Sequence, residues 1–110
     1  MDKSNFQTKL EKGLLKFKEA NYQEALNLFK NLEEEEKNFL VQWYLGHTYF
    51  RLHEYHLAIE YVEKSIQLKS EDSLNLNFLG ELYIKIKEYN KAISTLEKIL
   101  KIDPKNKNGL

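Results

Sequence analysis

Two of the three histidines, His53 and His56, are three residues apart, a spacing at which side chains of one helix can bind the same metal ion. Such a site needs a third and usually a fourth ligand, but the chain has no cysteine and no other ligand at a suitable spacing. The remaining histidine, His47, stands one helical turn before Arg51, and this pair either contacts an acidic group of a partner or faces solvent. We therefore predict no metal site and no cofactor.

None of the common catalytic patterns is present in the chain. It has no glycine-rich phosphate loop, no cysteine nucleophile and no serine in a nucleophile-elbow motif. Its carboxylates stand at helical spacing from lysines, as surface ion pairs do. The four glutamates at 33–36 form either an acidic docking patch or, more commonly for such a run, a solvated helix end. The sequence thus predicts no catalytic residue and a protein that is not an enzyme.

Aromatic side chains are the strongest candidates for a binding surface. Trp43, Tyr44, Phe50 and Phe78 stand out, because aromatic residues are preferred anchors in protein-binding patches. The alternative is that the same rings belong to the hydrophobic core, since helical spacing is typical of core residues as well. The sequence alone leaves both interpretations open.

Composition indicates a folded, helix-rich protein. Hydrophobic residues make up 42% and charged residues 31% of the 110 residues, and only one proline and four glycines interrupt the chain. The 17 basic and 17 acidic side chains balance, whereas nucleic-acid binders usually carry a basic excess, so we expect no nucleic-acid partner, RNA included. No segment reaches the ~18 consecutive apolar residues of a membrane span, and the first residues lack the apolar core of a signal peptide. We expect a soluble, cytoplasmic protein that binds no membrane.

An internal repeat is the main structural signal. Gly13, Gly46 and Gly80 lie 33 and 34 residues apart, and three further columns keep the same register: Tyr22, Tyr55 and Tyr89, then Ala25, Ala58 and Ala92, then Leu26, Ile59 and Ile93. Glycine within a helix costs about 1 kcal/mol relative to alanine, so its presence in every unit indicates a close approach of two helices. We expect the alanine twelve residues later to be the small residue opposite each glycine.

Apolar residues recur at helical spacing in every unit and predict six helices, at 5–19, 22–35, 39–52, 55–69, 73–87 and 89–102. Asn5 (or Ser4 with Gln7 as a capping box), Asn38 and Asp72 are the expected N-caps of the first helix of each unit. Asn21 suits the first hairpin turn, whereas the His53 and Lys87 turns lack a favourable residue. We predict one domain over 1–110, with repeats at 5–37, 38–71 and 72–104, a last helix ended before Pro104, and a tail at 105–110.

The pattern resembles the tetratricopeptide repeat family. The motif residues of the second unit are Trp43, Leu45, Gly46, Tyr49, Ala58 and Val62, and those of the third are Leu79, Gly80, Tyr83, Ala92, Leu96 and Pro104. The first unit is the weakest, with Gly13, Ala25 and Phe29 but lysines at Lys12 and Lys16, and Trp43 stands one place nearer its glycine than usual. The resemblance implies an all-α, right-handed superhelical solenoid of three helix hairpins.

The resemblance also implies a concave groove that binds a peptide or an amphipathic helix of a partner protein. Its expected residues are Leu14, Phe17, Leu40, Trp43, Tyr44, His47, Phe50, Arg51, Asn77, Phe78 and Glu81, and the expected packing residues are Gly13, Ala25, Gly46, Ala58, Gly80 and Ala92. Family members that clamp the carboxylate of a chaperone tail use lysines, asparagines and an arginine at positions held here by Leu10, Leu14, Tyr44, Leu74 and Phe78. We therefore expect no binding of chaperone tails through such a clamp.

The last helix suggests an alternative function. Leu96, Ile99 and Leu100, together with Ala92, would meet a further repeat, and left bare they would form an apolar strip. A second copy, another partner or further repeats of a longer array could cover this strip. The alternative hypothesis is therefore a structural or scaffold protein that dimerises through its last helix.

Overall fold

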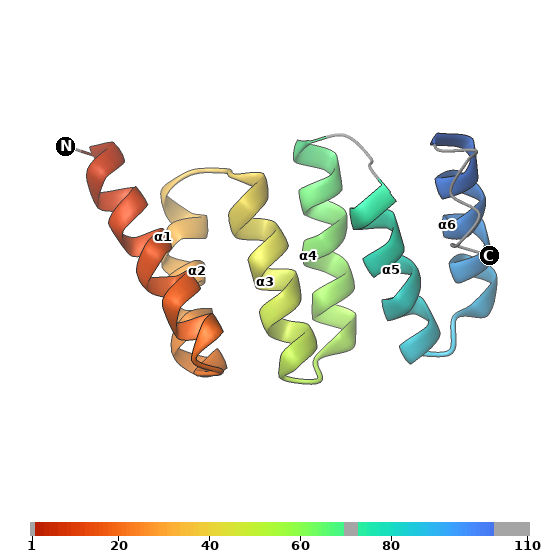
Figure 1. Cartoon of the computed structure of the whole chain (residues 1–110), viewed down its shortest axis with the longest axis horizontal. Helices are drawn as coiled ribbons and strands as arrows, with labels where there is room; N and C mark the ends of the chain where they lie inside the picture. Colours follow the sequence, from red (N-terminus) through yellow and green to blue (C-terminus); the bar gives the residue numbers. More distant parts are fainter. Residues whose placement is uncertain (1, 70–72, 103–110) are drawn as a thin grey trace.

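The computed structural model describes residues 2–69 and 73–102, and all regular structure in these ranges is helical (Figure 1). The helices are α1 (Asp2–Lys18), α2 (Tyr22–Glu35), α3 (Phe39–Arg51), α4 (Tyr55–Leu68), α5 (Ser73–Lys85) and α6 (Tyr89–Ile102). Helices that are consecutive in the chain pack against each other, from α1 and α2 to α5 and α6. Figure 1 shows the six side by side along the long axis of a body of 44 × 26 × 21 Å, with α1 and α6 at opposite ends. This confirms the predicted all-α solenoid.

The hydrophobic core lies between the hairpins as much as within them. One cluster joins α1 and α2 to the next hairpin through Leu10, Ala25, Phe29, Leu32, Val41, Leu45 and Tyr61. The second joins α4 to the last hairpin through Ala58, Ile59, Val62, Phe78, Leu79, Leu82, Tyr83 and Ala92. Because each cluster draws residues from neighbouring hairpins, no hairpin buries its apolar face without the next.

Helix boundaries follow the predictions to within three residues. The Asn38 cap is confirmed, since its Oδ1 accepts hydrogen bonds from the amides of Leu40 (2.9 Å) and Val41 (3.4 Å). The cap predicted at Asn5 is wrong: α1 already begins at Asp2, so Asn5, like Ser4, lies inside the helix. Neither proline nor glycine precedes Asn5 to stop the helix there. The predicted cap Asp72, Pro104 and the tail 105–110 lie outside the described residues.

The repeated glycines are buried, but their contacts differ from the expected glycine–alanine pairs. A Cβ atom added to Gly13 would lie 2.6 Å from Cε1 of Phe29, and one added to Gly46 would lie 2.7 Å from Cγ2 of Val62. The nearest side chain is therefore sixteen positions later, one helical turn beyond the alanine, although the backbone oxygen of Ala58 also lies 3.3 Å from the Cβ added to Gly46. At Gly80 the nearest atom, in Thr95, is 3.8 Å from such a Cβ, an ordinary contact.

The glycine contacts predict opposite effects for one substitution at two equivalent positions. Gly80→Ala should raise the free energy of unfolding by about 0.5–1 kcal/mol, because alanine is the better helix former and the site has room. Gly46→Ala should lower it by about 1–2 kcal/mol, because Val62 is fully buried and cannot yield to the new methyl group. Urea denaturation of the two variants measures both values, and an equal change in both would contradict the steric explanation.

The three hairpin turns share one backbone geometry. Ala20, His53 and Lys87 adopt left-handed conformations with φ of 63°, 64° and 65°. The amide of the following residue donates to a carbonyl five residues back, as in the bond of 2.8 Å from Asn21 to Lys16, which defines a Schellman motif. The left-handed residue of the first turn is thus Ala20 and not Asn21, whose φ is −88°. The expectation that Asn21 relieves this turn is wrong because it stands one place too late.

Candidate functional site

Aromatic rings form a continuous series across the first helices of the three hairpins. From α1, Phe17 contacts Tyr44 of α3 with 6.0 Å between ring centroids, and Tyr44 contacts Trp43 at 5.3 Å. The ring centroids of Trp43 and His47 are 3.9 Å apart. His47 in turn stacks on Phe78 of α5, with 4.0 Å between ring centroids and an interplanar angle of 10°. The structure therefore brings together rings from helices that are far apart in the sequence.

The predicted groove residues fall into three groups by exposure. Leu14, Phe17, Trp43, Tyr44, His47 and Phe50 are partly buried, whereas Leu40, Arg51, Asn77 and Glu81 are exposed. Phe78 is only 8% exposed and packs among His47, Phe50 and the second core cluster. Phe78 thus supports the other rings from beneath and offers little surface of its own.

Residues at equivalent positions of successive repeats form columns that run across α1, α3 and α5. Trp43 and Asn77 occupy one column, and His47 and Glu81 the next. Two strongly exposed apolar residues complete the columns of Leu40 and Phe50: Leu74, which is 68% exposed, and Ile84, which is 51% exposed. Sequence reasoning missed them as surface residues, although extending the same columns to the third unit would have found both.

His47 is a neutral aromatic spacer in this series and not a charged group. Burial and, to a smaller extent, the neighbouring charge of Arg51 together lower its pKa from 6.5 to about 4. Its Nε2 atom is buried without a hydrogen-bond partner. Of the proposed His47–Arg51 pair, only the Arg51 guanidinium is exposed, and it lies 5.9 Å from the centroid of the Phe50 ring.

The other histidine pair takes no part in a metal-binding arrangement. His53 Nδ1 lies 2.9 Å from the Tyr55 hydroxyl, in an exposed hydrogen bond next to the turn. Across residues 2–69 and 73–102, no three His, Cys, Asp or Glu side chains gather closely enough to hold a metal ion. Within the same ranges, no helix has the length and hydrophobicity needed to cross a membrane.

The glutamates at 33–36 are not uniformly solvated. Glu33 Oε1 accepts a hydrogen bond of 3.2 Å from the Tyr61 hydroxyl of α4, and its carboxylate lies within 4 Å of Lys30 and Lys64. Glu34, Glu35 and Glu36 are exposed. Glu35 also pairs with Lys9 of α1. The first residue of the run therefore joins two hairpins, Glu35 joins α2 to α1, and Glu34 and Glu36 are solvated.

The exposed edge of α6 differs in part from the predicted strip. Ile99 is 1% exposed and Ala92 is also buried, because both lie on the inner side of α6, so Ile99 cannot contribute to a self-association edge. Leu96 and Leu100 are half-buried. The most exposed large apolar residues of α6 are Tyr89, Ile93 and Ile102. We define the α6 edge as Tyr89, Ile93, Leu96 and Leu100, which recur at helical spacing.

Comparison with solved structures shows a close fold likeness to tetratricopeptide repeat proteins. The crystal structure of MamA matches with a TM-score of 0.87 and 24% identity over 98% of this chain and 64% of that one. A tetratricopeptide repeat protein from Parabacteroides merdae matches with a TM-score of 0.87 and 23% identity over 96% of this chain and 41% of that one. The chain thus spans less than two thirds of either protein.

A third structure contains a ligand peptide. The first tetratricopeptide repeat domain of Spaghetti (RPAP3), bound to an HSP90 peptide, matches with a TM-score of 0.82 and 20% identity over 94% of this chain and 83% of that one. At these identities the likeness shows the fold alone. No curated protein sequence matches the chain.

A family model provides the sequence-level match. The model of the fourth ARM domain of tetratricopeptide repeat protein 21 matches residues 41–109, which is more than half of the chain. The matched segment begins in α3 and includes all of α4, α5 and α6. The repeat register, the three stacked hairpins and this match together show that the chain belongs to the tetratricopeptide repeat family.

Proposed function

We propose that the protein is an interaction module that binds an apolar peptide or amphipathic helix of a partner across α1, α3 and α5. The observation that carries this proposal is the ring series around Trp43, which is partly exposed and held in place by Tyr44 and His47 on its own helix. Rings fixed in this way lose little conformational freedom when a partner covers them. The exposed Leu40, Leu74 and Ile84 extend the apolar surface beyond the rings.

Polar side chains at the margin of this surface would orient the partner. Arg51 on α3 and Glu81 on α5 are exposed and opposite in charge, so they favour a partner segment that is itself dipolar or carries both charges. The Spaghetti domain bound to an HSP90 peptide supports the general mode, in which a domain of this fold binds a peptide.

The chemistry of the surface argues against a chaperone-tail ligand. The positions that would clamp a terminal carboxylate carry Leu10, Leu14, Tyr44, Leu74 and Phe78, of which only Tyr44 has a polar atom. A carboxylate placed there would lose its hydration without gaining a cation. We therefore propose a ligand recognised through apolar side chains within the segment and not through its terminal carboxylate.

Trp43→Ala should weaken binding of the partner segment at least about tenfold while the fold is retained, because Trp43 is partly exposed and central in the ring series. The partner is first captured on immobilised protein and identified by mass spectrometry, and a synthetic peptide covering its contact segment is then titrated by calorimetry. Leu57→Ala, which removes a partly exposed apolar side chain on α4 outside both proposed binding surfaces, is the control and should bind normally. Equal affinity of wild type and Trp43→Ala for that peptide, with both variants folded by circular dichroism, would refute the proposed site.

Self-association through the α6 edge is the second candidate function. The observation that favours it is the exposure of Ile93, which is 54% exposed, whereas Ile59, in the same repeat column, is 8% exposed beneath α5. An apolar strip of this kind on an end helix is a typical interaction surface.

A further inference from the structure

We propose that the α6 edge of one copy docks in a hollow between α1 and α2 of a second copy, so that the molecules stack head to tail and continue the solenoid. This inference rests on the second candidate function and adds the receiving surface. It is independent of binding across α1, α3 and α5.

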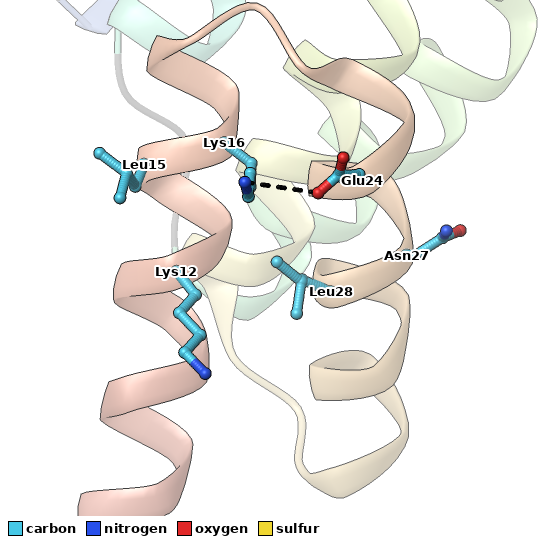
Figure 2. Close-up of a pocket in the computed structure, with 6 residues that line it drawn as sticks. All are labelled: Lys12, Leu15, Lys16, Glu24, Asn27 and Leu28. Carbon is cyan, nitrogen blue, oxygen red and sulfur yellow. Dashed lines mark ion pairs between the residues drawn. The ribbon is translucent and has the colours of Figure 1, made fainter.

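The receiving surface is a hollow of about 570 Å³ at the α1 end of the solenoid, lined by Lys12, Leu15, Lys16, Glu24, Asn27 and Leu28. Figure 2 shows Lys12, Lys16 and Leu28 between the two helices, with the ion pair of Lys16 and Glu24 linking them. Leu15 is 54% exposed. The hollow therefore combines apolar side chains with lysines.

The repeat register identifies the hollow as a seat for a helix. Its six lining residues correspond, one repeat later, to Leu45, Thr48, Tyr49, Leu57, Glu60 and Tyr61. In that second hairpin Leu45 and Tyr61 are buried in one cluster with Ala25, Phe29 and Leu32 of α2. The second hairpin thus receives the second helix of the hairpin before it at this position. The first hairpin has the same position, but no helix of the described chain covers it.

The α6 edge, at the opposite end of the solenoid, is the surface that would dock in this hollow. Within the chain, the second helix of a hairpin presents its edge to the next hairpin, as α4 presents Ile59 and Val62 to α5. Their counterparts on α6 are Ile93 and Leu96, and no described helix follows α6. A second copy stacked in register would place this edge in the hollow of Leu15 and Leu28.

Charge complementarity at the same register favours a second copy as the occupant. Between α4 and α5, the Tyr83 hydroxyl donates a hydrogen bond of 2.9 Å to Glu63 Oε2, and Leu79 lines the same hollow as Glu63. The counterparts of Leu79 and Tyr83 in the first hairpin are Lys12 and Lys16.

The counterpart of Glu63 on α6 is Glu97, which is exposed. Head-to-tail stacking would thus place the Glu97 carboxylate beside Lys12 and beside Lys16, which already pairs with Glu19 and Glu24. Symmetric pairing of two α6 edges would instead leave Lys12 and Lys16 without this carboxylate and the hollow empty.

Two variants that each disable one surface test the proposal. Leu15→Glu blocks the hollow and Ile93→Glu blocks the edge, and both residues are 54% exposed, so the fold should tolerate the changes. Wild type should form a concentration-dependent series of oligomers in sedimentation velocity, because a head-to-tail contact is open-ended. Each variant alone should be monomeric, but an equimolar mixture should form a heterodimer, since one copy retains the edge and the other the hollow. Leu57→Glu is the control on α4, where the same repeat column holds Glu24 and Lys91, and it should associate as wild type does.

Other outcomes distinguish head-to-tail docking from self-association of the α6 edge by symmetric pairing. If Leu15→Glu still dimerises while Ile93→Glu is monomeric and the mixture forms no heterodimer, the α6 edge pairs with itself and head-to-tail docking is wrong. A wild-type monomer at all concentrations overturns both, and leaves the Trp43 site to be judged by its own titration. Within the head-to-tail contact, Glu97→Lys should weaken association up to about fivefold, and Lys12→Glu should restore it, because Lys12 is exposed and lines the same hollow.

Discussion

Replacing Ala20, His53 and Lys87 together with glycine should raise the free energy of unfolding by about 2–3 kcal/mol and the melting temperature by about 10 °C. All three residues have φ near +64° in the turns that join the helices of each hairpin. In this region the Cβ atom of an L-residue crowds its own backbone, whereas glycine has no such penalty. The gain is smaller than the full penalty because glycine also gives the unfolded chain more freedom.

The matched controls for the first two turns place the glycine one residue later. Asn21 and Glu54 follow the first two left-handed residues and have φ of −88° and −97°. Glycine there relieves no strain, so Asn21→Gly and Glu54→Gly should be neutral or destabilising in thermal denaturation. The three stabilising effects should add, since the turns belong to separate hairpins. A triple variant no more stable than wild type would show that the left-handed turns carry no relievable strain.

Acidification from pH 7 to pH 4 should cost the protein about 2 kcal/mol of stability through His47 alone. In the folded state, burial and Arg51 lower the pKa of His47 from 6.5 to about 4. Between these two values the unfolded chain binds a proton that the folded protein does not, so the free energy of unfolding falls as the pH falls. Above pH 6.5 the imidazole is neutral in both states, and the full stability is present. The full pKa shift of His47 corresponds to a loss of about 3 kcal/mol in the free energy of unfolding. Partial solvent access to the imidazole reduces this loss.

Two substitutions isolate the His47 contribution. His47→Phe keeps an aromatic ring between Trp43 and Phe78 but cannot take up a proton. The free energy of unfolding, measured with urea at several pH values, should therefore depend less steeply on pH in this variant between 6.5 and 4. His56→Gln changes an exposed histidine and should retain the wild-type slope. Parallel profiles for wild type and His47→Phe would show that His47 does not cause the loss.

Local patterns in the sequence were sufficient for the elements and their register. Helical spacing of apolar residues placed the helices, because burial of one face requires that period wherever the helix packs. The Asn38 cap depends only on amides two and three residues away, so it too could be predicted. The cap at Asn5 failed because a cap requires the chain before it to leave the helix, and nothing local to Asn5 enforces that.

Contacts between helices could not be predicted in the same way. The side chains nearest to Gly13 and Gly46 are those of Phe29 and Val62, one turn beyond the expected alanines, because the position of contact depends on how two helices cross. In the sequence, His47 and Arg51 formed a pair that either contacts an acidic group of a partner or faces solvent. The position of His47 between Trp43 and Phe78 makes it a neutral ring, which depends on a residue thirty-one positions away.

By itself, the sequence determined the helices, the repeat register and the family, because these follow from spacing along one chain. Only the tertiary structure decided which members of a repeated column are covered. Ile59 and Ile93 are both isoleucines in the same repeat column, yet Ile59 is buried beneath α5 and Ile93 is exposed. The physical reason is that burial depends on the neighbouring hairpin, and the repeat pattern is the same whether or not that neighbour is present.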